Sequence, residues 1–232
     1  MKGRVAFQGA MGAYSQAAIW KFLGRDTECL PCATFEELFH AVLDGRATHA
    51  LLPVENSTTG SVHPAYDLLL EHPLFIQREL ILRIEHALLA APNTSLERIR
   101  RVTSHPQALA QLYGLQVLDR SIQDWAENYT RFFLLGMQPA PYTSQAKTTV
   151  VFATAHVPGA LYHCLGEFAS RNLNLTRIES RPDRKQPWHY LFYVDVEGHS
   201  ADSPLRAALQ ALAAHTTFLR ILGSYPAALP GS

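Results

Sequence analysis

The sequence contains few cysteines, no long apolar run and no excess of either charge. Three cysteines in 232 residues are too few for a disulfide framework. Cys29 and Cys32 have the spacing of a redox pair or of half a zinc site, but no second cysteine pair or close histidine pair follows. We therefore predict buried or half-buried thiols without a functional role.

The charge balance and the hydrophobic content indicate which class of partner the protein binds and where in the cell it is found. Twenty Lys and Arg residues balance twenty Asp and Glu residues, which argues against nucleic acid or a membrane surface and favours a small metabolite. No stretch approaches the roughly 18 apolar residues of a membrane span, and the first residues lack the apolar core of a signal peptide. With 47% hydrophobic residues, we predict a globular, cytoplasmic protein.

The first 73 residues alternate segments typical of strands and helices. The segments are, in order, a strand at 4–9, helices at 14–23 and 35–43, a strand at 49–55 and a helix at 64–72. Thr34 and Glu37 have capping-box spacing at the start of the second helix. This alternation predicts an α/β fold with a mostly parallel sheet and with ligands at the carboxyl ends of its strands.

A second α/β lobe begins near residue 84 and is short. Residues 74–91 have a strand-like pattern, and Thr94 with Glu97 repeats the capping-box spacing before a predicted helix in "RIRRVTSHPQALAQ". Only residues 84 to about 136 are left for this lobe, which is little for two packed layers. The stretch "MQPAPYTSQAK" then has the composition of a linker.

The C-terminal third predicts the order βαββαβ. Its segments are "TTVVFATA", "PGALYHCLGEFASR", "NLTRIESR", "HYLFYVDVEG", "SPLRAALQALAAH" and "TFLRILGSY". Ser203 is the expected cap of the second helix, with Pro204 in its first turn. This order is typical of a ferredoxin-like domain, with an antiparallel sheet and two helices on one face.

Two loops after predicted strands carry groups that can contact a ligand. In "FQGAMGAYSQAA", Gly9 and Gly12 allow close backbone approach, although strand-to-helix turns are often glycine-rich for geometric reasons. In "PVENSTTGS", Asn56, Ser57 and their neighbours concentrate donors where a strand meets a helix start. Such a cluster can bind a carboxylate or can simply cap the helix, and composition alone does not separate the two.

Two further segments offer candidate catalytic groups. "NYTRF" places the Thr130 hydroxyl next to the Arg131 guanidinium, which is well shaped to bind a carboxylate; the alternative is a strand residue beside a surface arginine. His105 in "SHPQAL" is a minor candidate for an acid or base, because a histidine before a proline in a turn more often caps it or faces solvent.

Taken together, these segments resemble prephenate dehydratase with a C-terminal regulatory ACT domain. "FQGAMGAYSQAA", "LLPVENSTTGSV", "SHPQALAQ" and "NYTRF" stand in the family's order, and "GAL" and "ESRP" resemble the two ACT signatures for phenylalanine. The resemblance implies a two-lobed catalytic region of the periplasmic-binding-protein type at residues 1–138 and a ferredoxin-like ACT domain at 147–226. It also implies conversion of prephenate to phenylpyruvate, water and CO₂ without metal or cofactor.

The resemblance assigns roles residue by residue. It implies that Thr130 and Arg131 are catalytic, Thr130 as the donor to the departing hydroxyl, and that substrate is bound by Gly9, Gly12, Ser15, Glu55, Asn56, Ser57 and Phe132. Phenylalanine as allosteric effector is assigned to Gly159, Ala160, Leu161, Glu179, Ser180, Arg181 and Pro182, at the interface of a homodimer or homotetramer.

The chain departs from the family at one junction. Several dozen residues normally separate the "SHPQALAQ" helix from the "LYGLxVL" segment, whereas here Gln111 runs directly into Leu112. The second lobe is therefore predicted to be truncated. Three hypotheses follow: a phenylalanine-regulated dehydratase acting on prephenate or arogenate, a phenylalanine-binding ACT protein with impaired catalysis, and a binding module for a small carboxylate.

Overall fold

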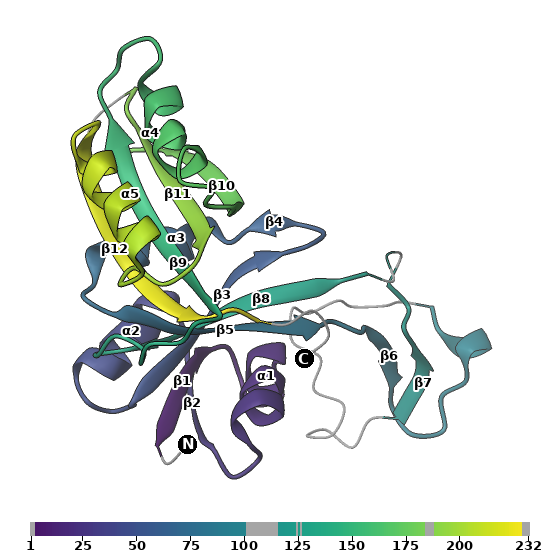
Figure 1. The fold of residues 1–232 in the computed structure, drawn as a ribbon. Helices are drawn as coiled ribbons and strands as arrows, with labels where there is room; N and C mark the ends of the chain where they lie inside the picture. The colour runs from purple at the N-terminus through teal and green to yellow at the C-terminus, as the bar shows by residue number, and fades with distance from the viewer. Residues whose placement is uncertain (1–2, 101–115, 124, 126, 184–187, 229–232) are drawn as a thin grey trace. The chain divides into compact units, whose positions relative to one another are not determined.

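The computed structural model describes residues 3–100, 116–123, 125, 127–183 and 188–228 (Figure 1). The chain forms two compact units. The first comprises Met1–Pro73 and Leu80–Met137, and the second comprises Leu74–Glu79 and Gln138–Leu229. The predicted domain boundaries, 1–138 and 147–226, stay predictions.

A mixed sheet forms the centre of the first unit. Its strands are β1 (Arg4–Gln8), β2 (Glu28–Cys32), β3 (His49–Asn56), β5 (Phe75–Arg83) and β8 (Tyr129–Gly136), in the order β2-β1-β3-β8-β5. β1 is parallel to β2 and β3, as expected, and β8 is antiparallel to β3. The short β4 (Gly60–Ser61) pairs back on the end of β3.

Three helices accompany this sheet (Figure 1): α1 (Tyr14–Leu23), α2 (Phe35–Leu43) and α3 (His63–Glu71). The α1 side of the sheet forms a core in which Ala18 and Ile19 pack with Phe7 and Phe132. The Thr34 hydroxyl caps α2 by accepting from the Glu37 N–H at 3.1 Å. The sequence therefore predicted these helices and this cap correctly.

The second lobe is reduced to a small sheet in the described part of the chain. β6 (Ala87–Ala90) and β7 (Gln116–Arg120) pair antiparallel, with a 3-10 turn at Leu96–Arg98 between them. The cap of this turn is Ser95 without a side-chain hydrogen bond, so the predicted Thr94 cap is wrong. Residues 101–111, which include His105 and most of the predicted helix, lie outside the described residues. The shortened lobe agrees with the sequence prediction.

The second unit has the predicted βαββαβ order. Its elements are β9 (Ala146–Thr154), α4 (Ala160–Ala169), β10 (Leu175–Pro182), β11 (Tyr190–Glu197), α5 (Ser203–Ala213) and β12 (Thr216–Pro226). The sheet order is β10-β11-β9-β12, with antiparallel neighbours throughout. α4 and α5 bury Phe168 and Leu212 against Val150 and Val194 on one face. The ferredoxin-like prediction is confirmed.

The cap of α5 differs from the prediction by one residue. Asp202 is the N-cap and Ser203 is the first helical residue. The Asp202 carboxylate accepts from the His199 N–H at 2.8 Å and makes no cap hydrogen bond to the helix. Neighbouring Asp and Ser are both good caps, so the local sequence left the choice open.

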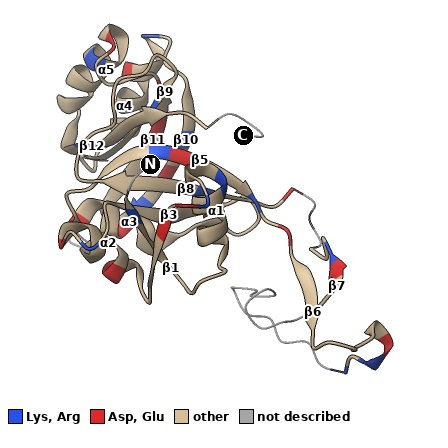
Figure 2. Ribbon diagram, turned by 90° about the horizontal axis from the view of Figure 1, so that it is seen from below, with Lys and Arg blue, Asp and Glu red and all other residues tan. Residues whose placement is uncertain are grey.

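Charged residues of both signs are interspersed along the ribbon of each unit (Figure 2), as the balanced composition leads one to expect. None of the helices among the described residues is long and apolar enough to cross a membrane.

The segment Leu74–Glu79 belongs to the second unit through three kinds of contact. The Lys147 ammonium lies 3.0 and 2.9 Å from the two carboxylate oxygens of Glu79, which is 2% exposed. The Gln77 amide donates to the Gln138 carbonyl at 2.7 Å. At Gly223 in β12 the packing is so close that an added Cβ would lie 2.3 Å from the Ile76 carbonyl oxygen.

Gly223→Ala is therefore expected to lower the free energy of unfolding by about 1–3 kcal/mol, because backbone must move to admit the methyl group. Gly166 in α4 is the matched control, since its added Cβ meets nothing within 4 Å. Gly166→Ala should be neutral or stabilising by up to about 1 kcal/mol. Urea denaturation measures both changes, and equal stability of the two variants would contradict the close contact.

Candidate active site

Two of the motifs meet where β3 ends and β8 begins. In the antiparallel pairing, Asn56 lies opposite Thr130 and Glu55 lies opposite Arg131. The motifs "PVENSTTGS" and "NYTRF" are therefore brought together from distant parts of the sequence.

The Asn56 side chain links the two strands and the loop after β3. Its amide nitrogen lies 2.7 Å from Asn128 Oδ1, 3.1 Å from the Tyr129 carbonyl and 3.1 Å from Thr130 Oγ1. Its amide oxygen accepts from the backbone N–H groups of Thr58 and Thr59, at 2.9 and 3.1 Å. The amide nitrogen thus holds the start of β8, and the amide oxygen holds the turn that follows β3.

Ser57 also contacts backbone. Its hydroxyl donates to the Glu127 carbonyl at 3.0 Å and accepts from the Tyr129 N–H at 2.9 Å, and its own N–H donates to the Tyr129 carbonyl at 2.8 Å. These contacts hold the entry to β8 against the end of β3. Ser57 therefore joins the two strands and does not cap α3, whose N-cap is Val62 without a side-chain hydrogen bond.

A pocket of about 520 Å³ opens beside this junction. Its lining residues come from α1, the end of β3 and the turn after it, the segment after β5, and the start of β8 with the segment before it: Tyr14, Asn56, Thr58, Thr59, Ile84, His86, Gln123, Trp125, Asn128 and Thr130. All belong to the first unit. Among the described residues, the lining is a mixture of hydroxyl, amide, imidazole, aromatic and aliphatic groups, and none of them is a carboxylate. A few polar groups in a partly apolar pocket suit a small organic ligand.

Tyr14 and His86 are pocket residues that the sequence analysis missed. The Tyr14 hydroxyl donates to the Glu85 carbonyl at 2.7 Å and lies 3.2 Å from His86 Nδ1. Burial, and to a smaller degree the Glu85 carboxylate, raises the pKa of the Tyr14 phenol, so the hydroxyl keeps its proton at neutral pH. Tyr14 lies inside the motif "FQGAMGAYSQAA", so the sequence could have indicated it as a pocket residue. Nothing in the local sequence indicates His86.

Arg131 lies on the other face of β8 from Thr130, because side chains alternate along a strand. Its Nε is 3.3 Å from the Glu55 carboxylate, a second nitrogen is 3.4 Å from the Tyr66 hydroxyl, and the guanidinium lies 5.0 Å from the centre of the Phe133 ring. Neither Arg131 nor Glu55 is among the residues that line the pocket.

The other predicted substrate residues also lie outside the pocket lining. Gly9 and Gly12 have φ angles of 123° and 92°, so the turn needs glycine for its own conformation. Ser15 is buried in the first turn of α1, and Phe132 is part of the core on the α1 side of the sheet. Their predicted contacts with substrate stay predictions.

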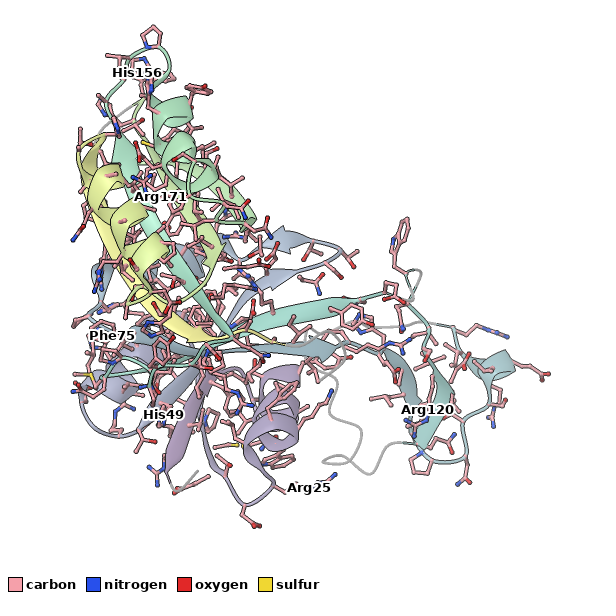
Figure 3. All side chains as sticks on the ribbon, in the orientation of Figure 1. Arg25, His49, Phe75, Arg120, His156 and Arg171 are labelled. Atoms are coloured by element: carbon pink, nitrogen blue, oxygen red, sulfur yellow. The ribbon has the colours of Figure 1, made fainter. Side chains whose placement is uncertain are left out.

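The second unit has a pocket of about 530 Å³ at the start of α4. The predicted residues Gly159, Ala160 and Leu161 line it, together with His156 in the loop after β9 (Figure 3) and Tyr190 on β11. Gly159 adopts φ 79° as the N-cap of α4, a left-handed conformation that favours glycine.

The predicted residues 179–182 lie on β10, at the edge of the same sheet. They do not line the pocket, but Ser180 pairs with Phe192 and Pro182 with Tyr190, and both partners are lining residues on β11. Glu179 forms an ion pair with Arg177, and Arg181 is largely buried. The predicted residues 179–182 therefore lie on the strand next to β11, which lines the pocket together with the predicted residues 159–161.

Asn56→Asp tests the strand-linking role of the amide. Aspartate cannot donate to Asn128 Oδ1, the Tyr129 carbonyl and Thr130 Oγ1, and its charge would face these acceptors. We expect a loss of about 2–3 kcal/mol in the free energy of unfolding. The exposed Asn93→Asp is the control with the same change of charge, and chemical denaturation that shows the same stability for both variants would contradict this role.

Comparison with known sequences shows the family. A family model for prephenate dehydratase matches residues 5–112, and a model for the ACT domain matches residues 148–214. Arogenate dehydratase/prephenate dehydratase 2, chloroplastic, of Arabidopsis thaliana is 40% identical over 277 residues, covering 96% of this chain and 72% of the relative. That alignment is longer than the 232-residue chain, so the relative has positions without a counterpart here.

Two solved structures resemble the chain over nearly its whole length. A prephenate dehydratase from Arthrobacter aurescens in complex with L-Phe has a TM-score of 0.86 and 30% identity, covering 98% of this chain and 93% of that one. A quorum quenching acylase described as a novel type also has a TM-score of 0.86, with 34% identity and coverage of 97% and 98%. From these matches, the chain belongs to the prephenate dehydratase family and carries an ACT domain at its C-terminal end.

Proposed function

We propose that the protein converts prephenate to phenylpyruvate in the first-unit pocket. In this reaction the ring hydroxyl leaves with a proton as water and the ring carboxylate leaves as CO₂. The electron pair of the broken carbon–carbon bond completes the aromatic ring. The protein has to orient a dicarboxylate and donate a proton or a strong hydrogen bond to the departing hydroxyl. Family membership supports this activity.

The orientation of the Thr130 hydroxyl is the observation that carries the proposal. Asn56 Nδ2 lies 3.1 Å from Thr130 Oγ1 and donates to it. This contact occupies a lone pair of the oxygen and leaves the O–H free to donate. Thr130 also lines the pocket. A threonine is a weak acid in water, so its contribution arises from this fixed position and from the local field, and solvent restores its proton after turnover.

The remaining polar groups of the pocket are proposed to hold the substrate. Thr58 and Thr59 offer hydroxyl groups and Gln123 offers an amide, whereas the Tyr14 proton is already donated to the Glu85 carbonyl. Neutral donors orient a carboxylate without neutralising it. A ring carboxylate that is weakly stabilised loses CO₂ more readily than one held by a guanidinium. Arg131, which contacts Glu55 and Tyr66, is then a positioning residue that supports β8.

Thr130→Val keeps the shape of the side chain and removes the hydroxyl. We expect kcat for phenylpyruvate formation to fall by about 10²–10⁴-fold, with a much smaller change in KM, because the lost group donates in the transition state. Thr130→Ser, which keeps a hydroxyl, is the matched control and should retain most of the activity. A Thr130→Val variant that turns over at the wild-type rate would remove Thr130 from the mechanism.

Arogenate is the competing substrate, because it differs from prephenate only in carrying an amine in place of the side-chain keto group. The name of the Arabidopsis relative includes both activities. Measuring kcat/KM for both compounds with the same preparation decides the preference.

A hydrolytic activity is a second candidate. The acylase of known structure matches 97% of this chain and is 34% identical to it. In such a reaction water adds across an amide bond and releases a carboxylic acid and an amine. Assaying an acylated amine beside prephenate, with Thr130→Val in both assays, separates the two activities.

We propose that phenylalanine regulates the enzyme through the pocket at the start of α4. The amino acid's carboxylate is expected near the helix N-terminus and the Gly159 turn, and its ring against Leu161. A second copy of the chain is proposed to complete the site beside the β10 edge. The ACT match and the L-Phe complex of the Arthrobacter relative support this proposal.

Gly159→Ala is expected to weaken phenylalanine binding by about tenfold or more, because alanine is strained at φ 79°. Titration calorimetry measures the affinity, and the exposed Ala169 end of α4 offers a control in Ala169→Ser. Light scattering should show at least a dimer. A protein that stays monomeric with and without phenylalanine would contradict the proposed interface.

A further inference from the structure

A cluster of two histidines and one glutamate lies on α2 and at the end of α3, away from both pockets. Glu36 and His40 lie one helical turn apart on α2, so their side chains share a face. His72 follows the last residue of α3. The ligand atoms of all three side chains lie within 4.8 Å of one another.

Two of the three ligand-atom distances in the cluster are close to those of a metal site, and the third is at most 4.8 Å. His40 Nε2 and His72 Nε2 each lie 3.2 Å from the same oxygen of Glu36, Oε1. In a tetrahedral site with bonds of about 2.0–2.1 Å, neighbouring ligand atoms are about 3.3–3.4 Å apart. A small inward movement of the rings would therefore let one ion bind all three atoms.

Packing holds the His72 ring in place before any ion binds, and helix capping fixes the backbone that carries Glu36. The His72 ring stacks on Phe39, with centroids 5.1 Å apart and an interplanar angle of 29°, and its side chain is 14% exposed. The capping hydrogen bonds of Thr34 and Glu37 fix the first turn of α2, which carries Glu36. Glu36 and His40 are about half exposed, at 52% and 49%, so an ion can reach the cluster from solvent.

We propose that Glu36, His40 and His72 bind a divalent transition-metal ion, with Zn²⁺ as the best fit. Imidazole ligands favour zinc, nickel or copper over magnesium and calcium, and two histidines with one carboxylate form a known zinc ligand set. The open coordination positions face solvent and take water. The ion ties α2 to the end of α3 and so stabilises the first unit.

The alternative is a hydrogen-bonded cluster in which one carboxylate accepts from two imidazoles. The two cases differ in their response to metal. We propose titrating tag-free, chelator-treated protein with ZnCl₂ and, separately, with MgCl₂, by calorimetry. The metal site predicts one tightly bound Zn²⁺ per chain and no comparable binding of Mg²⁺. Absence of zinc binding in the wild-type protein overturns the proposal.

Single substitutions test whether His40 and His72 are the residues that bind zinc. His40→Gln and His72→Gln should each weaken zinc binding by about 100-fold or more, since losing even an outer-shell partner weakens metal sites about 10–100-fold. His215→Gln is the matched control, because His215 is similarly exposed at 40% and contacts one glutamate oxygen at 3.2 Å. It should bind zinc as the wild type does. Equal losses in the control and in His40→Gln overturn the assignment.

Thermal unfolding gives a second readout that does not depend on the His72 variant folding. Free Zn²⁺ at 100 times its dissociation constant should raise the unfolding temperature of the wild type by about 5–10 °C. His40→Gln, at an exposed position, should fold normally and lose this shift. An equal shift in both proteins contradicts the proposed site. The cluster shares no residue with the dehydratase pocket, so the outcome is independent of the proposed activity.

Discussion

The amide of Asn56 is the contact on which the geometry of the proposed active site depends. Its nitrogen faces three acceptors at the start of β8, and its oxygen accepts from the turn that follows β3. One side chain therefore links the two strands, holds the turn after β3 and donates to the Thr130 oxygen. Among the side chains, only asparagine and glutamine combine two N–H donors with an acceptor oxygen in one planar group.

Strand alternation separates two residues that are neighbours in the sequence. Thr130 lines the pocket, and Arg131 contacts Glu55, Tyr66 and Phe133 on the opposite face. The motif "NYTRF" thus combines one residue that lines the pocket with one that contacts the neighbouring strand. This division keeps the Arg131 guanidinium out of the described pocket lining, which is compatible with the decarboxylation proposed above.

The described lining of this pocket comes from segments that the chain retains beside its shortened second lobe. The described part of that lobe is a two-stranded sheet. The pocket lining comes from α1, the end of β3 and the turn after it, the segment after β5, and the start of β8 with the segment before it, so the groups proposed to act on the ring lie in the part of the chain that is retained. A solved relative of similar extent matches the chain over 97% of its length, which indicates that the fold tolerates this size.

The sequence by itself determined the helices at 14–23 and 35–43, the βαββαβ order and the family, because apolar periodicity, caps and motif order are local properties of the chain. It could not place the pocket beside Tyr14 and His86, or bring His72 to Glu36, since both depend on packing between distant segments. The sequence analysis grouped Thr130 and Arg131 as neighbouring catalytic candidates, whereas strand alternation puts them on opposite faces of β8. Only the tertiary structure decided which of the two faces holds the pocket, because the packing of α1 and the β5 end determines where space is left.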